Sequence, residues 1–392
     1  MNINIEENKN KIAIVAVGYN RIKSMQRLLQ SLESAHYNHQ DIPLVISIDA
    51  SGDQELYDYV RHFEWSHGEK YVNIQDERLG LRKHIIQCGD LTEYFRAVII
   101  LEDDIFVSEY FYQYVEAAVN FYEEEDRVGG ISLYQNEMNG TLPICFMNDG
   151  SDTYLKQSPA SWGECWTSSQ WSKFKKWYNE FDDSRFSELD MPEYIKSWKK
   201  AWSKYYMAYL IDTNRYFVFP HVSHTTCFSD AGEHNANHST IGQVNLLCGS
   251  KEYQFKPFDE MVKYDIYFTN QDIYEWVGIS ESELCVDFDG KNSNIRNKRY
   301  LLTPIELPYK KMQSYGLQMR PIELNVRYRI AGTGLFLYDT LGESYYKGGQ
   351  ELPLSVAYYY LRLFNFKLTK KYLIDAYKTK IANQIRRFFR IR

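Results

Sequence analysis

Three adjacent acids, Glu102, Asp103 and Asp104, directly follow the most hydrophobic short run of the chain, residues 97–101 (AVIIL). Carboxylates this close together repel one another unless a cation or positively charged ligand groups offset their charge. Oxygen-only ligands favour Mg²⁺ or Mn²⁺, which also bind the diphosphate of a nucleotide. The alternative is a solvated acidic turn that caps a helix starting near Ser108. We favour the metal and diphosphate site, because the acids follow a buried strand.

A candidate general base lies in residues 161–166, Ser-Trp-Gly-Glu-Cys-Trp. Glu164 is the first choice, because Trp162 and Trp166 offer apolar walls that can raise its pKa and stack on an acceptor sugar. Its rivals are acids of the Trp-rich region that follows: Asp182, Asp183 and Asp190.

Four histidines lie in or near the loop that starts at Pro220: His221, His224, His234 and His238. His234 is the candidate for completing a metal shell or bonding a phosphate, because Gly232 before it allows a close approach. The other three are expected to be structural. A zinc site is not expected, because thiolate ligands and HExxH spacing are missing.

Strands and helices must position these residues, and alternating short apolar runs and helical periodicities indicate where they lie. The pattern predicts strands at 12–17, 43–49, 70–75 and 97–101, with helices at 22–35, at 54–63 and up to about residue 88. This alternation of strands and helices predicts an α/β fold with a doubly wound sheet, whose ligand crevice lies beyond the carboxyl ends of its strands. The acids at 102–104 lie at such an end.

Beyond residue 126 the pattern loosens into a strand at 129–134, Trp-rich helices within 168–209, and a strand followed by the His-rich loop at 216–238. We therefore expect a catalytic domain at 1–245, with a nucleotide half to about 130 and an acceptor half after it. Residues 246–392 are expected to form a C-terminal extension of short strands. Its last segment, 367–392, alternates basic and apolar residues, which suits either an anionic membrane surface or docking onto the domain.

Composition narrows the class of protein. A formal net charge of -7 over 392 residues argues against a nucleic-acid binder. Six scattered cysteines without a CxxC pair fit reduced thiols, and no signal peptide or membrane span is evident in the sequence. These features predict a cytoplasmic protein, with peripheral contact at the inner membrane face as an option through the basic tail. The sequence does not indicate which oligomeric state the protein adopts.

Four segments resemble the GT-A glycosyltransferases: VAVGYNR at 15–21, RLGLRKHI at 78–85, IILEDDIFVSEYFYQY at 99–114 and SWGECW at 161–166. Within that group the sequence is similar to the inverting N-acetylglucosaminyltransferase I-like enzymes and to related bacterial capsule or lipopolysaccharide enzymes, over roughly the first 240 residues. The resemblance implies a GT-A fold with a mixed sheet. It also implies a DXD-type motif in which Asp104 ligates the metal, Asp103 lies near the ribose and Glu102 near the donor sugar.

The same resemblance implies that residues 18–21, namely Gly18, Tyr19, Asn20 and Arg21, border the nucleotide, and that Asp49 contacts the uracil or ribose. Gly18 permits close backbone approach, and Asp49 can accept hydrogen bonds from ring N–H groups or sugar hydroxyls. Simple helix-entry packing is the alternative for Tyr19 and Arg21. Arg82 can pair with a phosphate or with the acidic cluster, whereas His84 is expected to pack.

Together these features predict a metal-dependent inverting transfer of a hexose or N-acetylhexosamine from a UDP-sugar to a glycan or lipid-linked glycan, in bacterial surface polysaccharide synthesis. One rival is a sugar nucleotidyltransferase, but VGYNRIKS lacks the Gly-rich, basic loop expected after its first strand. The other rival is a noncatalytic carbohydrate-binding or scaffold protein of a glycan assembly complex.

Overall fold

The computed structural model describes residues 3–139, 142–230, 240–292, 298–341 and 352–361, together with residues 367, 369–371, 373–375, 377–378 and 381. Its centre is a nine-stranded mixed sheet. In spatial order the strands are β11 (Lys263–Tyr264), β7 (Thr153–Lys156), β9 (Tyr216–Pro220), β6 (Val128–Ser132), β8 (Glu164–Thr167), β4 (Ala97–Glu102), β1 (Ile12–Gly18), β2 (Leu44–Ile48) and β3 (Lys70–Ile74). The α/β fold class expected from the sequence is confirmed.

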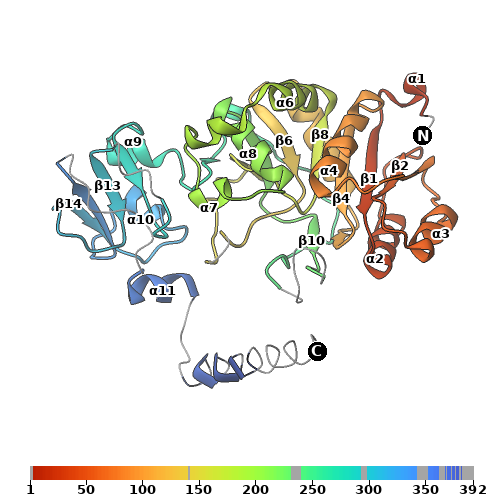
Figure 1. The fold of residues 1–392 in the computed structure, drawn as a ribbon. Helices are drawn as coiled ribbons and strands as arrows, with labels where there is room; N and C mark the ends of the chain where they lie inside the picture. The colour runs from red at the N-terminus through yellow and green to blue at the C-terminus, as the bar shows by residue number, and fades with distance from the viewer. Residues whose placement is uncertain are drawn as a thin grey trace.

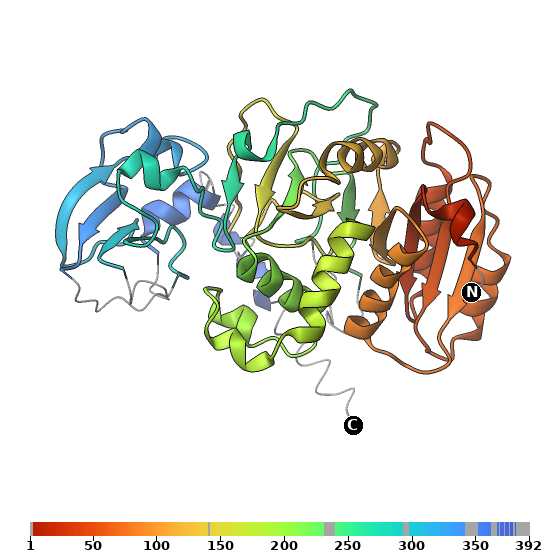
Figure 2. The ribbon, with the colours of Figure 1, turned by 90° about the horizontal axis from the view of Figure 1, so that it is seen from above.

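The first four strands in the chain, β1 to β4, are mutually parallel and belong to residues 1–130, the part expected to bind the nucleotide. The sheet becomes mixed where β8 enters antiparallel between β4 and β6. This insertion places Glu164 opposite Ile100 on one side and opposite Ser132 on the other. Figure 2 shows residues 1–130 (red to orange), residues 131–245 (yellow to green) and the blue C-terminal sheet side by side.

Helices cover both faces of the sheet because its central strands are apolar on both faces. In β1 every residue is buried, with Ile14 facing one hydrophobic core and Val15 the other. One face is covered by α2 (Ile22–Glu33), α3 (Gln54–His62) and α5 (Phe111–Tyr122), and the other by α4 (Leu81–Gly89), α6 (Ser168–Glu180) and α8 (Trp202–Asp212). Two short helices, α1 (Ile5–Asn8) and α7 (Glu193–Lys196), complete this part.

A two-stranded ribbon lies next to the carboxyl end of β4. It pairs β5 (Ile105–Val107) with β10 (Thr225–Cys227) in antiparallel register. The main-chain N–H of Phe228 donates to the carbonyl oxygen of Asp104 at 2.9 Å. The ribbon therefore brings the loop after β10 against the acidic cluster.

A second, smaller sheet forms the C-terminal part. Its strands, in spatial order, are β12 (Leu284–Val286), β13 (Tyr300–Thr303), β15 (Leu335–Asp339) and β14 (Lys310–Tyr315), and its helices are α9 (Ile273–Val277), α10 (Leu324–Arg327) and α11 (Leu354–Leu361). These elements enclose a hydrophobic core of their own. Figure 1 shows this sheet beside the acceptor half and away from β1 to β3.

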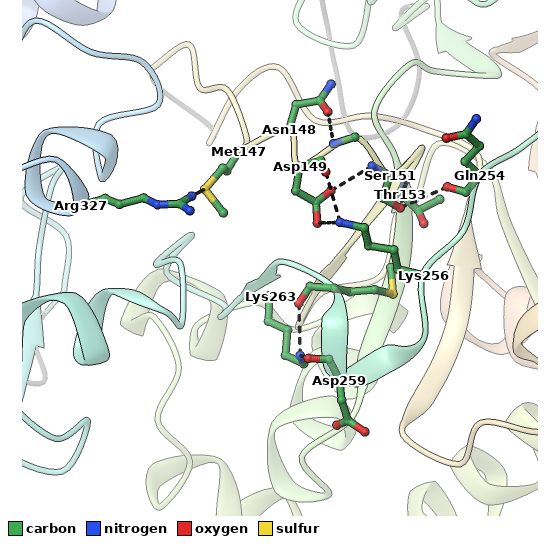
Figure 3. A network of polar contacts seen from close by, with 12 residues as sticks. Met147, Asn148, Asp149, Ser151, Thr153, Gln254, Lys256, Asp259, Lys263 and Arg327 are labelled. Carbon is green, nitrogen blue, oxygen red and sulfur yellow. Dashed lines mark hydrogen bonds and ion pairs between the residues drawn. The ribbon is translucent and has the colours of Figure 1, made fainter.

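Two segments that follow residue 245 contact the earlier part of the main domain. The Nζ of Lys256 donates to Asp149 Oδ2 at 2.8 Å, and the guanidinium of Arg327 reaches the sulfur of Met147 at 3.3 Å (Figure 3). Tyr253 and Phe255 pack on the main core, and β11 extends the main sheet. The main core therefore continues beyond residue 245, to Tyr264.

The described part of the chain contains no helix long and apolar enough to cross a membrane. The basic segment at 367–392 falls largely outside the described residues.

Candidate functional site

The acidic cluster lies where the sequence placed it, at the carboxyl end of β4 and in the turn to β5. Glu102 is the last residue of β4, and Asp103 is only 4 % exposed. The neighbouring strand β1 runs parallel, with Val17 opposite Glu102. The end of β1 and the acidic cluster therefore meet at the same edge of the sheet.

Arg21 supplies the positive charge at this edge. It is the N-cap residue of α2, and its Nη2 donates to Asp103 Oδ1 while its Nε donates to Asp103 Oδ2 at 3.2 Å. Its Nη1 lies 3.3 Å from Asp104 Oδ2 and 3.2 Å from the carbonyl oxygen of Asp230. Burial alone lowers the pKa of Arg21, but the charges of Asp103 and Asp104 raise it above its usual range.

A single arginine does not neutralise the cluster. Burial, and then repulsion from Asp104 and Asp103, raises the pKa of Glu102 to about 8. Burial also raises the pKa of Asp103 to about 6, although Arg21 opposes this shift. The cluster can therefore accommodate one more positive charge.

Asp104 offers the ligand atoms that an Mg²⁺ or Mn²⁺ ion needs. Its side chain is 16 % exposed, and within the described residues its Oδ1 accepts no hydrogen bond. One or two carboxylates plus substrate phosphates are the usual ligands of Mg²⁺. Among the described residues no group of three or more His, Cys, Asp or Glu side chains is arranged to hold a metal, so the protein atoms alone fit only a partial shell.

The histidines divide into two groups. His234 and His238 lie outside the described residues, so the expected metal or phosphate contact of His234 stays a prediction. His224 is buried and stacks on Tyr114 with ring centroids 4.3 Å apart, and burial lowers its pKa to about 3. This histidine is structural, as expected from the sequence.

The first turn after β1 carries the residues expected to border the nucleotide. A Cβ on Gly18 would lie 2.6 Å from the side chain of Met25, so this glycine admits the packing of α2 beneath the turn. Tyr19 is half-buried, and the guanidinium carbon of Arg78 lies 4.8 Å from the centroid of its ring. Asn20 is exposed.

Asp49, at the end of β2, holds the neighbouring turn. Its Oδ1 accepts from the main-chain N–H of Ala50 at 2.9 Å and of Leu79 at 2.8 Å, and its Oδ2 accepts from Gly80 at 2.9 Å. The residue is only 4 % exposed. Its carboxylate therefore fixes the backbone that leads into α4, and its expected contact with uracil or ribose stays a prediction.

Arg82 does not join the acidic cluster. Its guanidinium carbon lies 4.9 Å from the ring centroid of Tyr205 on α8, and within the described residues it forms no ion pair with the acids at 102–104. The pairing of Arg82 with the cluster is therefore wrong, because Arg21 takes that place, while pairing with a phosphate stays a prediction. His84 packs as expected: it is buried, and its Nε2 lies 2.7 Å from Ser47 Oγ.

Glu164 is enclosed beside Glu102. It is 1 % exposed, and within the described residues neither carboxyl oxygen has a well-formed hydrogen bond. Burial, followed by the charge of Glu102, raises its pKa well above the usual range. A buried polar group without a partner is uncommon and marks a site of strain or function. The structure thus keeps Glu164 as a candidate, in an enclosed position.

The two tryptophans beside Glu164 differ. Trp166 is fully buried and packs against Trp171, Trp202 and Tyr206, so the expectation that its ring stacks on an acceptor sugar is wrong. It shares a sheet face with Glu164 and provides the apolar wall instead. Trp162 is half-buried, with its ring 4.7 Å from that of Tyr134.

The rival acids have local roles. Asp182 caps a short 3-10 helix, Asp183–Ser187, by accepting from the N–H of Ser184 at 2.8 Å. Asp183 accepts from the hydroxyl of Tyr205 at 3.0 Å, and Asp190 accepts from Tyr267 at 2.9 Å.

A tether that was not expected from the sequence crosses this site. Asp230 Oδ2 accepts from Ser24 Oγ at 2.7 Å and also pairs with Arg27, while the guanidinium of Arg27 lies 3.8 Å from the ring centroid of Phe228. The tether joins the loop after β10 to α2. The spacing of Arg21, Ser24 and Arg27, three residues apart on one helix face, was the available signal.

No protein-family profile and no curated protein matches the sequence. Among solved structures, the chain is similar to S. aureus TarS 1-349 in complex with UDP-GlcNAc, with 15 % identity and a TM-score of 0.38 over 57 % of this chain and 60 % of that one. It is also similar to the mannosyltransferase PcManGT from Pyrobaculum calidifontis in complex with GDP-Man and Mn²⁺, with 10 % identity and a TM-score of 0.30 over 41 % of this chain and 45 % of that one. Each likeness spans less than two thirds of the neighbour's own length.

Proposed function

We propose that the chain is a metal-dependent inverting glycosyltransferase that moves a hexose or N-acetylhexosamine from a UDP-sugar to a glycan or lipid-linked glycan. The observation that carries the proposal is the charge arrangement at the carboxyl edge of the sheet. Three acids and Arg21 meet there beside the turns after β1 and β2. In an open α/β sheet this edge is where ligands bind.

In this proposal the protein positions the donor before any chemistry occurs. Asp49 holds the turn at Leu79 and Gly80, and that turn carries Arg78 against Tyr19. Asp104 would hold the Mn²⁺ or Mg²⁺ ion, which when bound offsets the charge that develops on the leaving diphosphate. Arg21 keeps Asp103 ionised and in place.

Glu164 is the proposed general base. Inverting transfer requires a group that takes the proton of the acceptor hydroxyl as its oxygen attacks the anomeric carbon. A carboxylate with a raised pKa suits that step, since its proton affinity is closer to that of the group it must serve. Because Glu164 is enclosed, side chains around it have to shift for an acceptor hydroxyl to reach it.

Metal-dependent binding of UDP tests the proposal. Thermal unfolding is measured with UDP and Mn²⁺, with UDP and a chelator, and with Mn²⁺ alone. Ligand at a hundred times its dissociation constant stabilises the folded state by about 2.7 kcal/mol. We expect this stabilisation only when UDP and Mn²⁺ are both present.

Asp104→Asn should abolish the joint effect. Asp58→Asn is the matched control, because it makes the same charge change on α3 at a side chain that is 55 % exposed. A UDP and Mn²⁺ response that persists in Asp104→Asn would remove the acidic cluster from donor binding. A screen of UDP-sugars for metal-dependent hydrolysis then identifies the donor.

A further inference from the structure

A pocket lies between the acceptor half of the main domain and the small C-terminal sheet. Its wall includes the loop at 143–146, the turn at 267–269, the chain that leaves β12 and residues 320–323. Residues of α11 close one side of it. The pocket is open to solvent, and its enclosed part has a volume of about 50 Å³. In Figure 1 the helix α7 lies between α10 of the small domain and β10 of the candidate active site.

Seven of the 19 residues that line the pocket are aromatic. They are Phe146, Tyr264, Tyr267, Phe268, Phe288, Tyr359 and Tyr360. Pyranose rings present flat faces of C–H groups, which pack on aromatic rings, while their hydroxyls need polar partners. An aromatic wall with polar groups set into it therefore suits a saccharide.

The turn that presents two of these rings is held rigidly. Asp265 Oδ1 accepts from the N–H of Tyr267 and of Thr269, each at 2.8 Å. Phe268, between them, has a φ of 63°, in the left-handed region that a bulky residue rarely adopts. Strain of this kind persists where the surrounding structure enforces it, and it is common at ligand sites.

The polar part of the wall is acidic. Asp287, Asp289 and Glu323 face the pocket together with two asparagines and one arginine, Arg320. The Nδ2 of Asn139 donates to Asp289 Oδ2 at 2.9 Å, and the hydroxyl of Tyr264 donates to Glu323 at 2.6 Å. An excess of carboxylates repels phosphates and other anions, so the pocket favours an uncharged ligand rich in hydroxyl donors.

Exposed aromatic residues continue from the pocket along α7. Tyr194 is 49 % exposed and Trp198 is 36 % exposed, and their ring centroids are 6.0 Å apart. Burial raises the pKa of Tyr194, and the charge of Asp289 adds to this shift. Asp289 lines the pocket, and its effect on Tyr194 is consistent with α7 lying beside it. Neighbouring exposed aromatic side chains are a feature of binding surfaces.

We infer that this pocket and α7 bind an uncharged saccharide chain, namely the part of the acceptor glycan remote from the reacting hydroxyl. The identity of the chain as acceptor rests on the proposed function, but saccharide binding itself does not. The pocket then selects acceptors by their interior sugars, while the acidic cluster handles the donor.

Two exposed cysteines give a test in the unmodified protein. Cys145 lines the pocket, whereas Cys248 lies outside it. The rate of alkylation of each thiol by iodoacetamide is measured by peptide mass spectrometry, with and without chitotetraose, maltotetraose or cellotetraose. For a dissociation constant of about 2 mM, roughly 20 mM of a probe should slow alkylation of Cys145 about tenfold. Alkylation of Cys248 should not change.

Variants test the contact surface. Phe288→Ala should remove the protection of Cys145, and Tyr328→Ala should preserve it, because Tyr328 is 57 % exposed on the same small domain but does not line the pocket. Thermal unfolding checks that both variants fold. If Phe288→Ala does not fold, Asp289→Asn replaces it, with the same expected loss of protection.

The outcomes separate the two proposals. If none of the three probes protects Cys145 in the unmodified chain, the pocket does not bind saccharides and the inference is overturned, whatever UDP does. If a probe protects Cys145 but UDP and Mn²⁺ do not stabilise the chain, the pocket stands and the transferase proposal fails. Equal protection of Cys145 and Cys248 would also overturn the inference, because the effect would then not arise in the pocket.

Discussion

Replacing Asp49 by asparagine separates two roles for this acid. The carboxylate accepts three main-chain hydrogen bonds, two at Oδ1 and one, from Gly80, at Oδ2. An asparagine side chain keeps one oxygen and places an NH₂ group in the other position. The NH₂ group cannot accept the hydrogen bond from the main-chain N–H of Gly80. Two donors then face each other without an acceptor between them.

The cost can be worked out bond by bond. A hydrogen bond to a charged group contributes about 1.5–3 kcal/mol, and one between neutral groups about 1 kcal/mol. Asp49→Asn loses one charged bond and weakens two, and the smaller desolvation cost of an amide offsets part of the loss. The net penalty is about 3 kcal/mol, borne by the turn at Leu79 and Gly80.

Hydrogen exchange measures this penalty at the turn itself. A loss of about 3 kcal/mol corresponds to roughly a 100-fold rise in the opening equilibrium, so peptides covering residues 78–80 should exchange about 100 times faster. Asp53→Asn is the matched control, because its Oδ1 caps α3 through Leu56 N–H at 3.1 Å. Aspartate and asparagine cap helices almost equally well, so we expect a change of less than about 1 kcal/mol there.

One result would refute this reasoning about Asp49. If UDP binding weakens while exchange at the turn stays at the wild-type rate, Asp49 acts directly on the nucleotide and not through the backbone. Exchange that rises together with a loss of UDP affinity supports the positioning role.

Three further predictions concern Glu164, the two tryptophans beside it and the buried His84. Glu164→Gln should lower turnover about 100-fold or more and preserve UDP affinity, since it removes only the proton acceptor; lost donor binding would assign Glu164 another role. Trp166→Ala should destabilise the fold by about 3–5 kcal/mol in urea unfolding, because it empties a buried site, whereas Trp162→Ala should cost less and change mainly the acceptor KM. Burial lowers the pKa of His84 from 6.5 to about 4, so the folded state binds fewer protons than the unfolded state in that window. The free energy of unfolding should therefore fall by up to about 3 kcal/mol as the pH drops from about 6.5 to 4, and His84→Gln should flatten this pH dependence; a profile identical to that of the unmodified chain would show that His84 does not titrate on unfolding.

The elements near the N-terminus were predictable because local patterns specify them. Strands buried on both faces read as continuous apolar runs, and α2 shows Met25, Leu28, Leu29 and Leu32 at helical spacing. The acids at 102–104 were located correctly for the same reason, since a strand end is a local feature. His84, which was expected to pack, is buried on α4 beside Ile85 and Ile86.

The contacts across the site depended on strand order, which local patterns do not specify. Trp166 is buried because β8 enters antiparallel beside β4, with Trp166 opposite Val98 in the centre of the sheet. The same register brings Glu164 next to Glu102. Arg82 was expected to pair with the acids or with a phosphate, and Arg21 to border the nucleotide. The placement of α2 against the carboxyl edge gives the pairing with Asp103 to Arg21 instead.

The pairing of Arg21 with Asp103 has a physical consequence for the proposed donor site. An arginine is charged at every pH that the folded protein experiences, so it holds Asp103 and the start of α2 in place before any ligand arrives. It leaves Oδ1 of Asp104 available within the described residues. A site with its dipoles and charges fixed in advance does not need to reorganise when charge develops on a leaving group. Removing one partner of a buried ion pair lowers the free energy of unfolding by about 3–5 kcal/mol. Arg21 therefore stabilises this edge of the sheet in the same arrangement of charges that the proposed donor site uses.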